Sequence, residues 1–182
     1  MHCFDGTPAF ERVHWGYRPS WAAEKGIPTA INAWIEKAAT GPYLKRLWKS
    51  GRVVVPADGW YEWTGEKGHK KPWHIRLADD GPMYFAAITN IWPDHEAKEG
   101  DGFVIVTAAV DAGMIDVHDR RPVVLTPEDA VLWTDNDLPS EQAEHLARSM
   151  ALPADAFEWY EVDTSVNRIG SNDPCLIAPL KR

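Results

Sequence analysis

The 182-residue sequence has few cysteines, no excess of positive charge and no long apolar run. Its two cysteines, Cys3 and Cys175, lie near opposite ends of the chain without a CxxC pair or a Cys/His cluster, which argues against a disulfide framework and a structural zinc site. No apolar stretch approaches the roughly 18 residues of a membrane span, and the opening MHCFDGTPAF lacks the regions of a secretory signal. We therefore expect a soluble, cytoplasmic protein that has reduced thiols and needs neither a metal nor another cofactor.

The net charge of −8 argues against a protein that binds duplex DNA through a large positive potential. A local basic groove is still compatible with this charge. Lys45, Arg46, Lys49 and Arg52 cluster in or beside one predicted helix, although on charge alone an ordinary solvated helix face is the preferred interpretation. The ten tryptophans predict an aromatic core for most of them, and a stacking surface for sugars or nucleobases is the alternative.

The pattern of strands and helices predicts an α+β fold with a curved or barrel-like mixed β-sheet flanked by helices. Short β-branched and aromatic segments, separated by Gly, Pro and charged turns, predict strands over 52–56, 60–63, 72–78, 83–92 and 103–110. Poor alternation makes the strand over 103–110 central, whereas regular alternation makes 72–78 half exposed. Capping signals predict helices over 42–50, 126–133 and 140–150. We expect one domain over 1–182 and a monomer.

Residues 53–63, VVVPADGWYEW, place a single carboxylate, Glu62, in a strand that should be buried. Alternation puts Glu62 on the same face as Trp60, with Tyr61 and Trp63 on the other. Desolvation there would raise the pKa of Glu62 and make it a general acid near neutral pH. The alternative is a structural carboxylate that an arginine or backbone donors satisfy.

Two further residues are candidates for a polar site. His118, in IDVHDRRPVVL (115–125), lies between Asp116 and Asp119, which suits proton transfer, although a buried structural histidine that caps a turn is an equally common outcome. Asn32 is a short polar residue in an apolar run. It can place an amide in a site or cap the following helix.

Together these segments resemble the SOS response-associated peptidase family, the abasic-site processing proteins that protect single-stranded DNA. The resemblance runs from about Trp15 to Pro179. It is carried by HWGYRPSW, INAWIEKAAT, VVPADGWYEW, FVIVTAAV, IDVHDRRPVVL and VDTSVNRIGSNDPCLIAP, in the family's order.

The resemblance implies a partner, single-stranded DNA with an abasic site, and a role at the nucleoid. In the family, an N-terminal cysteine attacks the ring-opened aldehyde with its α-amine and closes a thiazolidine through its thiol. The residues matching Glu62 and His118 act as acid/base groups, and the one matching Asn32 positions the cysteine and the sugar. For DNA contacts we assign the aromatic residues Trp15, Trp21 and Trp34 and the basic residues Lys45, Arg46, Arg120 and Arg121.

The sequence differs from the family at the residues that carry the reaction and at two that contact DNA. Family members begin Met-Cys-Gly-Arg, but this chain begins Met-His-Cys-Phe-Asp, and the bulky His2 disfavours removal of Met1. Cys3 is therefore no direct substitute, and we expect either an incomplete N-terminus or a lost nucleophile. The family's INAR arginine is Trp34, and a frequent lysine is Gly41. Losing both contacts should weaken DNA binding by about 2 to 4 kcal/mol.

Three functions follow as hypotheses. The first is an abasic-site processing enzyme with crosslinking or lyase chemistry, divergent or phage-related. The second is a degenerate, non-crosslinking binder of single-stranded DNA. The third is a small hydrolase or peptidase that uses Glu62 and His118.

Overall fold

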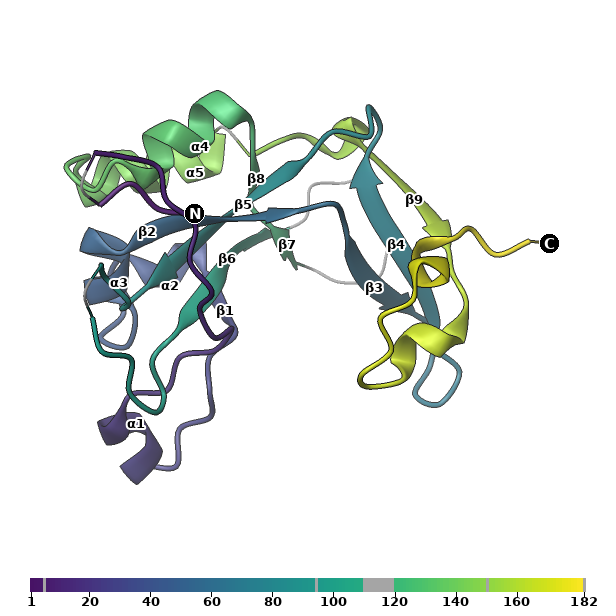
Figure 1. Cartoon of the computed structure of the whole chain (residues 1–182), viewed down its shortest axis with the longest axis horizontal. Helices are drawn as coiled ribbons and strands as arrows, with labels where there is room; N and C mark the ends of the chain where they lie inside the picture. The colour runs from purple at the N-terminus through teal and green to yellow at the C-terminus, as the bar shows by residue number, and fades with distance from the viewer. Residues whose placement is uncertain (5, 94, 110–119, 150, 182) are drawn as a thin grey trace. The chain divides into compact units, whose positions relative to one another are not determined.

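The computed structural model describes residues 1–4, 6–93, 95–109, 120–149 and 151–181 (Figure 1). The chain divides into two compact units. Unit 1 comprises Met1–Pro56, Tyr84–Ala108 and Arg121–Leu152, and unit 2 comprises Ala57–Met83, Ala109–Arg120 and Pro153–Arg182. The single domain over 1–182 stays a prediction.

Unit 1 is built on a mixed six-stranded sheet with the order β1-β6-β5-β2, to which β7 adds beside β6 and β8 beside β5. β1 runs parallel to β6, whereas β5 is antiparallel to both β6 and β8. The strands are β1 (Asn32–Trp34), β2 (Arg52–Ala57), β5 (Met83–Thr89), β6 (Phe103–Ala109), β7 (Arg120–Pro122) and β8 (Val124–Leu125). The helices are α1 (Ser20–Glu24), α2 (Ile35–Ala38), α3 (Lys45–Ser50), α4 (Pro127–Thr134) and α5 (Ser140–Ser149).

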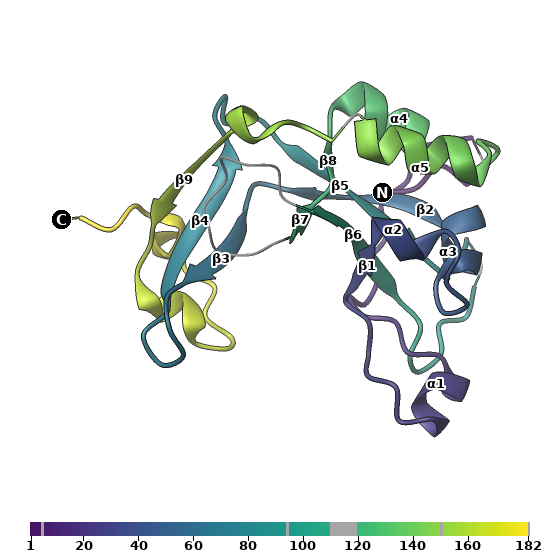
Figure 2. The ribbon, with the colours of Figure 1, turned by 180° about the vertical axis from the view of Figure 1, so that it is seen from behind.

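Four of these helices pack on one face of the sheet, and α4 and α5 lie side by side in both views (Figures 1 and 2). Two buried indoles, of Trp48 on α3 and Trp133 on α4, meet edge to face at 5.3 Å in the centre of this core. The sheet residues that join them are Ala33, Val54, Ala86, Ile88, Val104 and Val106. Because side chains alternate along a strand, the residues between these point to the opposite face, which we call the second face.

Three features reduce the number of free backbone hydrogen-bonding groups on the outer edge of β2. The amide and carbonyl of Arg52 both bond to the Asn136 side chain. The amide of Val54 donates to the Met1 carbonyl at 2.9 Å, and the Met1 α-amine donates to the Val54 carbonyl at 2.7 Å. Pro56 has no amide to offer. This edge therefore presents few groups to which another strand could add.

Unit 2 is built on a three-stranded antiparallel sheet with the order β3-β4-β9. Its strands are β3 (Trp60–Thr64), β4 (Lys71–Leu77) and β9 (Phe157–Glu161), and its short 3-10 helices are η1 (Ala154–Ala156), η2 (Thr164–Asn167) and η3 (Pro174–Ile177). Gly65 and Gly68, with φ of +97° and +95°, allow the turn between β3 and β4.

The α+β prediction is confirmed, with the strands shared between two sheets. β6 is central as expected, and Thr126 caps α4 by accepting from the Asp129 amide at 3.1 Å. Strand 83–92 ends earlier, at Thr89, and helix 42–50 begins later, at Lys45.

The expectation that most tryptophans lie in the core is wrong. Trp48 and Trp133 are fully buried, Trp15, Trp21 and Trp34 are exposed, and the others are half-buried. The reason is that the strands carrying many of them belong to the smaller sheet, which has no long helix among the described residues of unit 2 to cover it.

Candidate functional site

Glu62 lies in the middle of β3, opposite Trp73 of β4, which in turn lies opposite Glu161 of β9. The alternation predicted from sequence therefore places Glu62 and Trp60 on one face, and the pairing adds Trp73 to it. All five residues of β3 are half-buried rather than buried, which corrects the sequence expectation. Glu62 is thus partly desolvated but still accessible.

The aromatic surroundings of Glu62 are held in place by hydrogen bonds and ring contacts. The Trp73 indole donates to Thr64 Oγ1 at 2.9 Å, and Trp60 meets Phe157 edge to face at 5.4 Å. The second carboxylate on this face, Glu161, lies 3.8 Å from Lys71 Nζ. The two carboxylates therefore have different surroundings, with a lysine beside Glu161 and two indoles, of Trp60 and Trp73, on the face of Glu62.

The opposite face of the same sheet is organised around His74. This side chain is 4% exposed, lies 5.3 Å from the Tyr61 ring, and has Nδ1 3.2 Å from the Tyr160 hydroxyl. Because that hydroxyl donates to the Ile177 carbonyl, Nδ1 of His74 carries the proton of this contact. Burial lowers the pKa of His74, and the charge of Arg76 lowers it further. The strand over 72–78 was predicted to be half exposed, but His74 within it is buried, because Tyr61 and Tyr160 lie against its ring.

Gly59 connects this network to the strand of Glu62. A Cβ atom at Gly59 would lie 2.2 Å from His74 Nε2 and 2.8 Å from the Ile75 carbonyl oxygen. Only glycine allows the turn before β3 to approach β4 so closely.

In unit 1, Asn32 begins β1 and is exposed, with Ile105 of β6 as its partner. Ala33 points into the core and Trp34 is again exposed, so Asn32 and Trp34 share the second face. The N-cap of α2 is Trp34, without a side-chain hydrogen bond. Asn32 therefore does not cap this helix, and the other predicted role, the placement of an amide in a site, stays a prediction.

The three exposed tryptophans are each oriented by a neighbour. Trp15, half exposed, donates from its indole nitrogen to the Ile31 carbonyl at 2.9 Å. Lys37 Nζ lies 5.0 Å from the centre of the Trp34 ring, and Lys25 Nζ lies 5.8 Å from that of Trp21. An exposed indole beside a lysine offers a stacking plane and a positive charge together.

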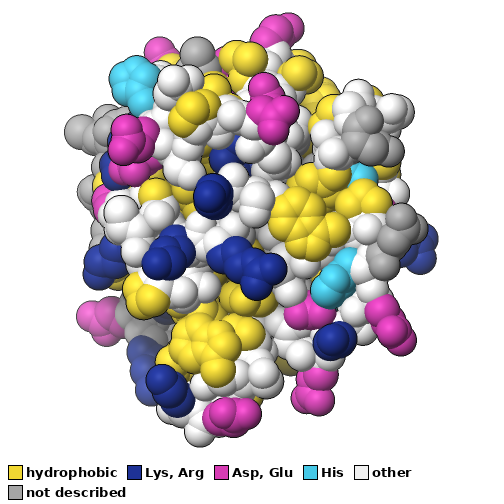
Figure 3. All heavy atoms as spheres, turned by 90° about the vertical axis from the view of Figure 1, so that its left-hand side faces the viewer, with side chains coloured by type: hydrophobic (Ala, Val, Ile, Leu, Met, Phe, Trp, Pro, Cys, Tyr) yellow, Lys and Arg dark blue, Asp and Glu magenta, His cyan; other side chains and the backbone are white. Residues whose placement is uncertain are grey.

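The predicted basic contacts differ in exposure. Lys45 and Arg46 are exposed on α3, on the side of Figure 1 where α1 also lies, and Figure 3 shows Lys and Arg side chains close together on that face. Arg120 is half-buried, whereas Arg121 is 6% exposed. Arg52, from the same sequence cluster as Lys45, is fully buried and is no part of a basic surface.

The two remaining predicted site residues are Cys3 and His118. Cys3 is a half-buried free thiol, two residues from the Met1 α-amine. Burial lowers the pKa of that α-amine, and the charge of Glu11 opposes this effect. His118 lies outside the described residues. Its pairing with Glu62 therefore stays a prediction.

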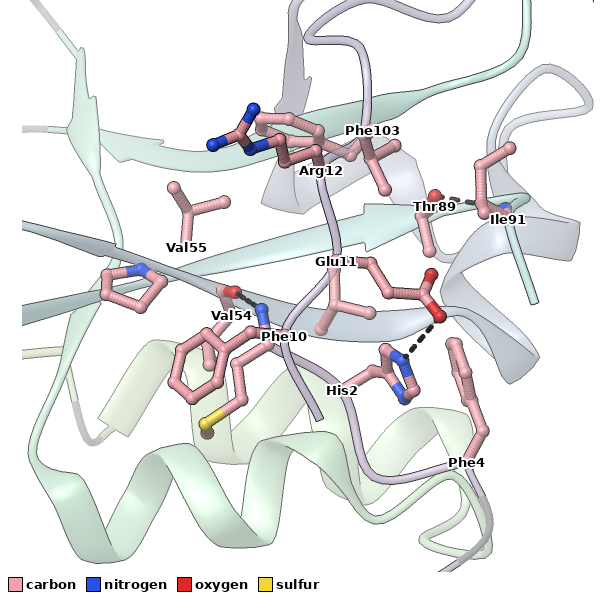
Figure 4. A pocket seen from close by; sticks show the side chains of 14 residues that line it. His2, Phe4, Phe10, Glu11, Arg12, Val54, Val55, Thr89, Ile91 and Phe103 are labelled. Atoms are coloured by element: carbon pink, nitrogen blue, oxygen red, sulfur yellow. Dashed lines mark hydrogen bonds and ion pairs between the residues drawn. The ribbon is translucent and has the colours of Figure 1, made fainter. Parts of the chain in front are cut away.

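A pocket on the second face of the sheet in unit 1 was missed by sequence reasoning (Figure 4). The walls come from β2, β5, β6 and the first thirteen residues, and two polar side chains, His2 and Glu11, face each other in it. These residues are nine positions apart, and no local motif connects them. An antiparallel pair between His2 and Ala9 brings them together, and the bonds of Met1 with Val54 hold this segment against β2.

The described ranges contain neither a metal site nor a membrane helix. No group of three or more His, Cys, Asp or Glu there is placed to hold an ion, and no helix there is long and apolar enough to span a bilayer.

Comparison with known proteins identifies the family. The model of the SOS response associated peptidase (SRAP) family matches residues 4–169, so the chain belongs to this family. It is 42% identical over 168 residues to the abasic site processing protein YedK of Escherichia coli, covering 92% of this chain and 74% of that protein. It is 32% identical over 170 residues to the abasic site processing protein YoqW of Bacillus subtilis, covering 91% and 75%.

Solved structures agree with this assignment. A phage-related protein of Bordetella bronchiseptica superposes with a TM-score of 0.74 at 40% identity, over 87% of this chain and 73% of the other. A protein of Bacteroides thetaiotaomicron gives 0.74 at 22% identity, over 92% and 75%, which supports the fold alone.

Proposed function

We propose that this chain is an abasic-site processing protein that binds single-stranded DNA and reacts with the sugar of an abasic site. The observation that carries the proposal is the position of Glu62, a half-buried carboxylate between Trp60 and the paired Trp73. Membership of the family, and relatives that are named abasic site processing proteins, support the same substrate.

Glu62 is the proposed acid/base group. An abasic deoxyribose is mostly a closed hemiacetal, and opening it requires a proton on the ring oxygen and removal of the proton from the anomeric hydroxyl. A carboxyl group within reach of both atoms can carry out both transfers, as an acid in one step and as a base in the other. His118 is the proposed second acid/base group, for Schiff-base formation and phosphate elimination.

Asn32 is the proposed positioning group, because its amide is exposed beside the stacking side chain of Trp34. A thiazolidine requires an amine and a thiol on one terminal residue: the amine adds to the aldehyde carbon with loss of water, and the thiolate then adds to the imine carbon. Cys3 meets this requirement only if Met1 and His2 are removed.

The proposed DNA surface of unit 1 consists of Trp15, Trp21 and Trp34 with Lys45 and Arg46. Bases stack on indoles regardless of sequence, and Lys45 and Arg46 contact phosphates. For Arg120 and Arg121 the proposed role is smaller, since both are at least partly buried.

The decisive experiment incubates the protein with single-stranded DNA that carries one abasic site and separates the products on a denaturing gel. A heat-stable shifted band, or strand cleavage at the lesion, is expected. Glu62→Gln should slow either product by about ten-fold or more. Glu66→Gln, the same change in the exposed turn after β3, is the matched control and should leave the rate unchanged. Absence of both products with intact protein would refute the proposal.

A second candidate function is binding of single-stranded DNA without any covalent reaction. The observation that favours it is that Trp21 and Trp34 are each exposed beside a lysine, an arrangement that does not require a nucleophile. Retention of lesion-free DNA on a native gel, without any covalent product, would select this function. Cleavage of a peptide substrate with no effect on DNA would instead select the peptidase alternative.

A further inference from the structure

The pocket on the second face has the walls of a site for a flat ligand. It encloses about 290 Å³ and lies entirely within unit 1. Val53 and Val55 of β2 form one side, and Phe103 of β6 lines another. Phe4 and Phe10 come from the first residues of the chain (Figure 4). This volume is at the lower end of ligand pockets, so it suits one small ring system rather than an extended chain.

Four polar side chains interrupt these apolar walls, namely His2, Glu11, Arg12 and Thr89, and the first two face each other. His2 is 7% exposed, and neither of its ring nitrogens has a hydrogen-bond partner among the described residues. Nε2 lies 3.4 Å from Glu11 Oε1, close enough for an ion pair but without the geometry of a hydrogen bond. Phe4 stacks on the imidazole at 4.7 Å with an angle of 18° between the rings, which fixes its plane. Buried nitrogens that lack a partner are unfavourable unless something else bonds to them.

We propose that this pocket binds one nucleobase of the DNA strand, with its face on the aromatic and valine side chains and its polar edge on His2 and Glu11. The inference rests on the proposed function for the source of the base. An imidazole and a carboxylate side by side offer a donor and an acceptor, which is what the edge of a base presents, and proteins that hold an unstacked base combine apolar walls with such an edge.

The position on the sheet supports this occupant. Phe103 is two residues before Ile105 on β6, and Ile105 is the partner of Asn32. Both side chains of β6 therefore face the same way as Asn32. The pocket and the proposed sugar-positioning amide thus lie on one face of one sheet, and a base next to the lesion fills the pocket while the abasic nucleotide lies at Asn32.

The first test uses the intact chain and free nucleosides, so it does not depend on reaction with abasic DNA. Adenosine and cytidine are titrated into the protein while the ring protons of His2 and the methyl groups of Val53 and Val55 are followed by NMR. At least one nucleoside should shift these signals in a saturable way. His2→Phe, which keeps the ring and removes both nitrogens, should weaken binding by about ten-fold. His145→Phe, the same change at an exposed position of α5, should leave it unaltered.

A pocket-filling variant keeps the test valid if His2→Phe fails to fold. Val55→Phe should abolish the nucleoside-dependent shifts, because Val55 is half-buried in the pocket wall. Absence of saturable shifts in the wild-type protein, or equal binding by wild type and Val55→Phe, would overturn the inference.

A second test uses oligonucleotides with an unreactive tetrahydrofuran lesion, with or without the base on either side. Removing one flanking base should weaken binding by about ten-fold in the wild type and have no effect in Val55→Phe; equal losses in both proteins would count against the pocket. If the chain neither binds nor modifies abasic DNA yet binds nucleosides here, the proposed function fails and the pocket stands. If it modifies abasic DNA but no nucleoside binds, only the pocket assignment fails.

Discussion

Arg52 offers the sharpest test of how unit 1 is stabilised. Its side chain is fully buried, and its guanidinium donates only to backbone carbonyls: Nε to Trp133 at 3.1 Å, Nη1 to Trp48 at 3.1 Å, and Nη2 to Asp135 and Leu138 at 2.5 and 2.8 Å. These carbonyls belong to the ends of α3 and α4 and to the loop after α4. One cation therefore joins two helix ends whose carbonyls have no partner within their own helices.

The cost of removing this cation follows from the groups that it leaves behind. Burial lowers the pKa of Arg52 and Asp135 opposes that effect, but a guanidinium remains protonated in either case. Arg52→Met fills part of the space and removes the buried charge, yet it leaves several buried carbonyls without a donor, each of which costs about 1 to 3 kcal/mol when unsatisfied. Because these terms are not additive and water can enter, we expect a loss of about 3 to 5 kcal/mol.

Urea unfolding followed by tryptophan fluorescence measures this loss, since Trp48 and Trp133 report on the core that Arg52 supports. Arg46→Met is the matched control, an exposed arginine of the same region whose loss should cost less than about 0.5 kcal/mol. Equal transition midpoints for Arg52→Met and the control would refute the idea that these carbonyls depend on the guanidinium.

Three further predictions concern other parts of the molecule. Gly59→Ala should destabilise unit 2 by about 1 to 3 kcal/mol in urea unfolding, because its Cβ would meet the His74 ring, and unchanged stability would mean that the turn can move. Burial raises the pKa of Asp101, but hydrogen bonds, foremost from His95, outweigh it and hold the pKa below its usual value, so the stability that they contribute is present above the unfolded pKa of about 4 and is lost as the pH falls through the folded pKa. Asp101→Asn should therefore flatten the acid limb of the stability profile, and an unaltered limb would exclude this carboxylate as its source. Trp34→Ala should weaken binding of single-stranded DNA by about 1 to 3 kcal/mol in a fluorescence anisotropy titration if the indole stacks on a base, and equal affinity would remove it from the interface.

The features that the sequence predicts well are those with a local cause. Thr126 caps a helix because its hydroxyl reaches an amide three residues away, and Gly51, the predicted stop signal, is the C-cap of α3. The alternation of Trp60 and Glu62 holds for the same reason, since neighbouring residues of any strand point to opposite sides.

The features that the sequence predicts poorly depend on partners far along the chain. His74 is buried because Tyr160, 86 residues later, covers it from β9. Arg52 belongs by sequence to a basic cluster, but its acceptors at Trp133 and Asp135 lie more than 80 residues away. A charge pattern cannot distinguish a phosphate-binding arginine from one that joins helix ends, because both need the same side chain.

The residues of the candidate site likewise differ in whether a local pattern or a distant partner determines their position. Glu62 was identifiable because a carboxylate in an aromatic strand conflicts with the local pattern, and such conflicts mark functional positions. Asn32 has no conflict of this kind. Its exposure follows from pairing in parallel with β6, more than 70 residues later, which turns Ala33 inward and the residues on either side of it outward. The pocket at His2 is harder still to predict from the sequence, because its walls depend on the pairing of Met1 with Val54 and of Trp15 with Phe103, besides the local pair of His2 and Ala9. The more a site depends on such pairings between distant segments, the less of it a sequence pattern alone can reveal.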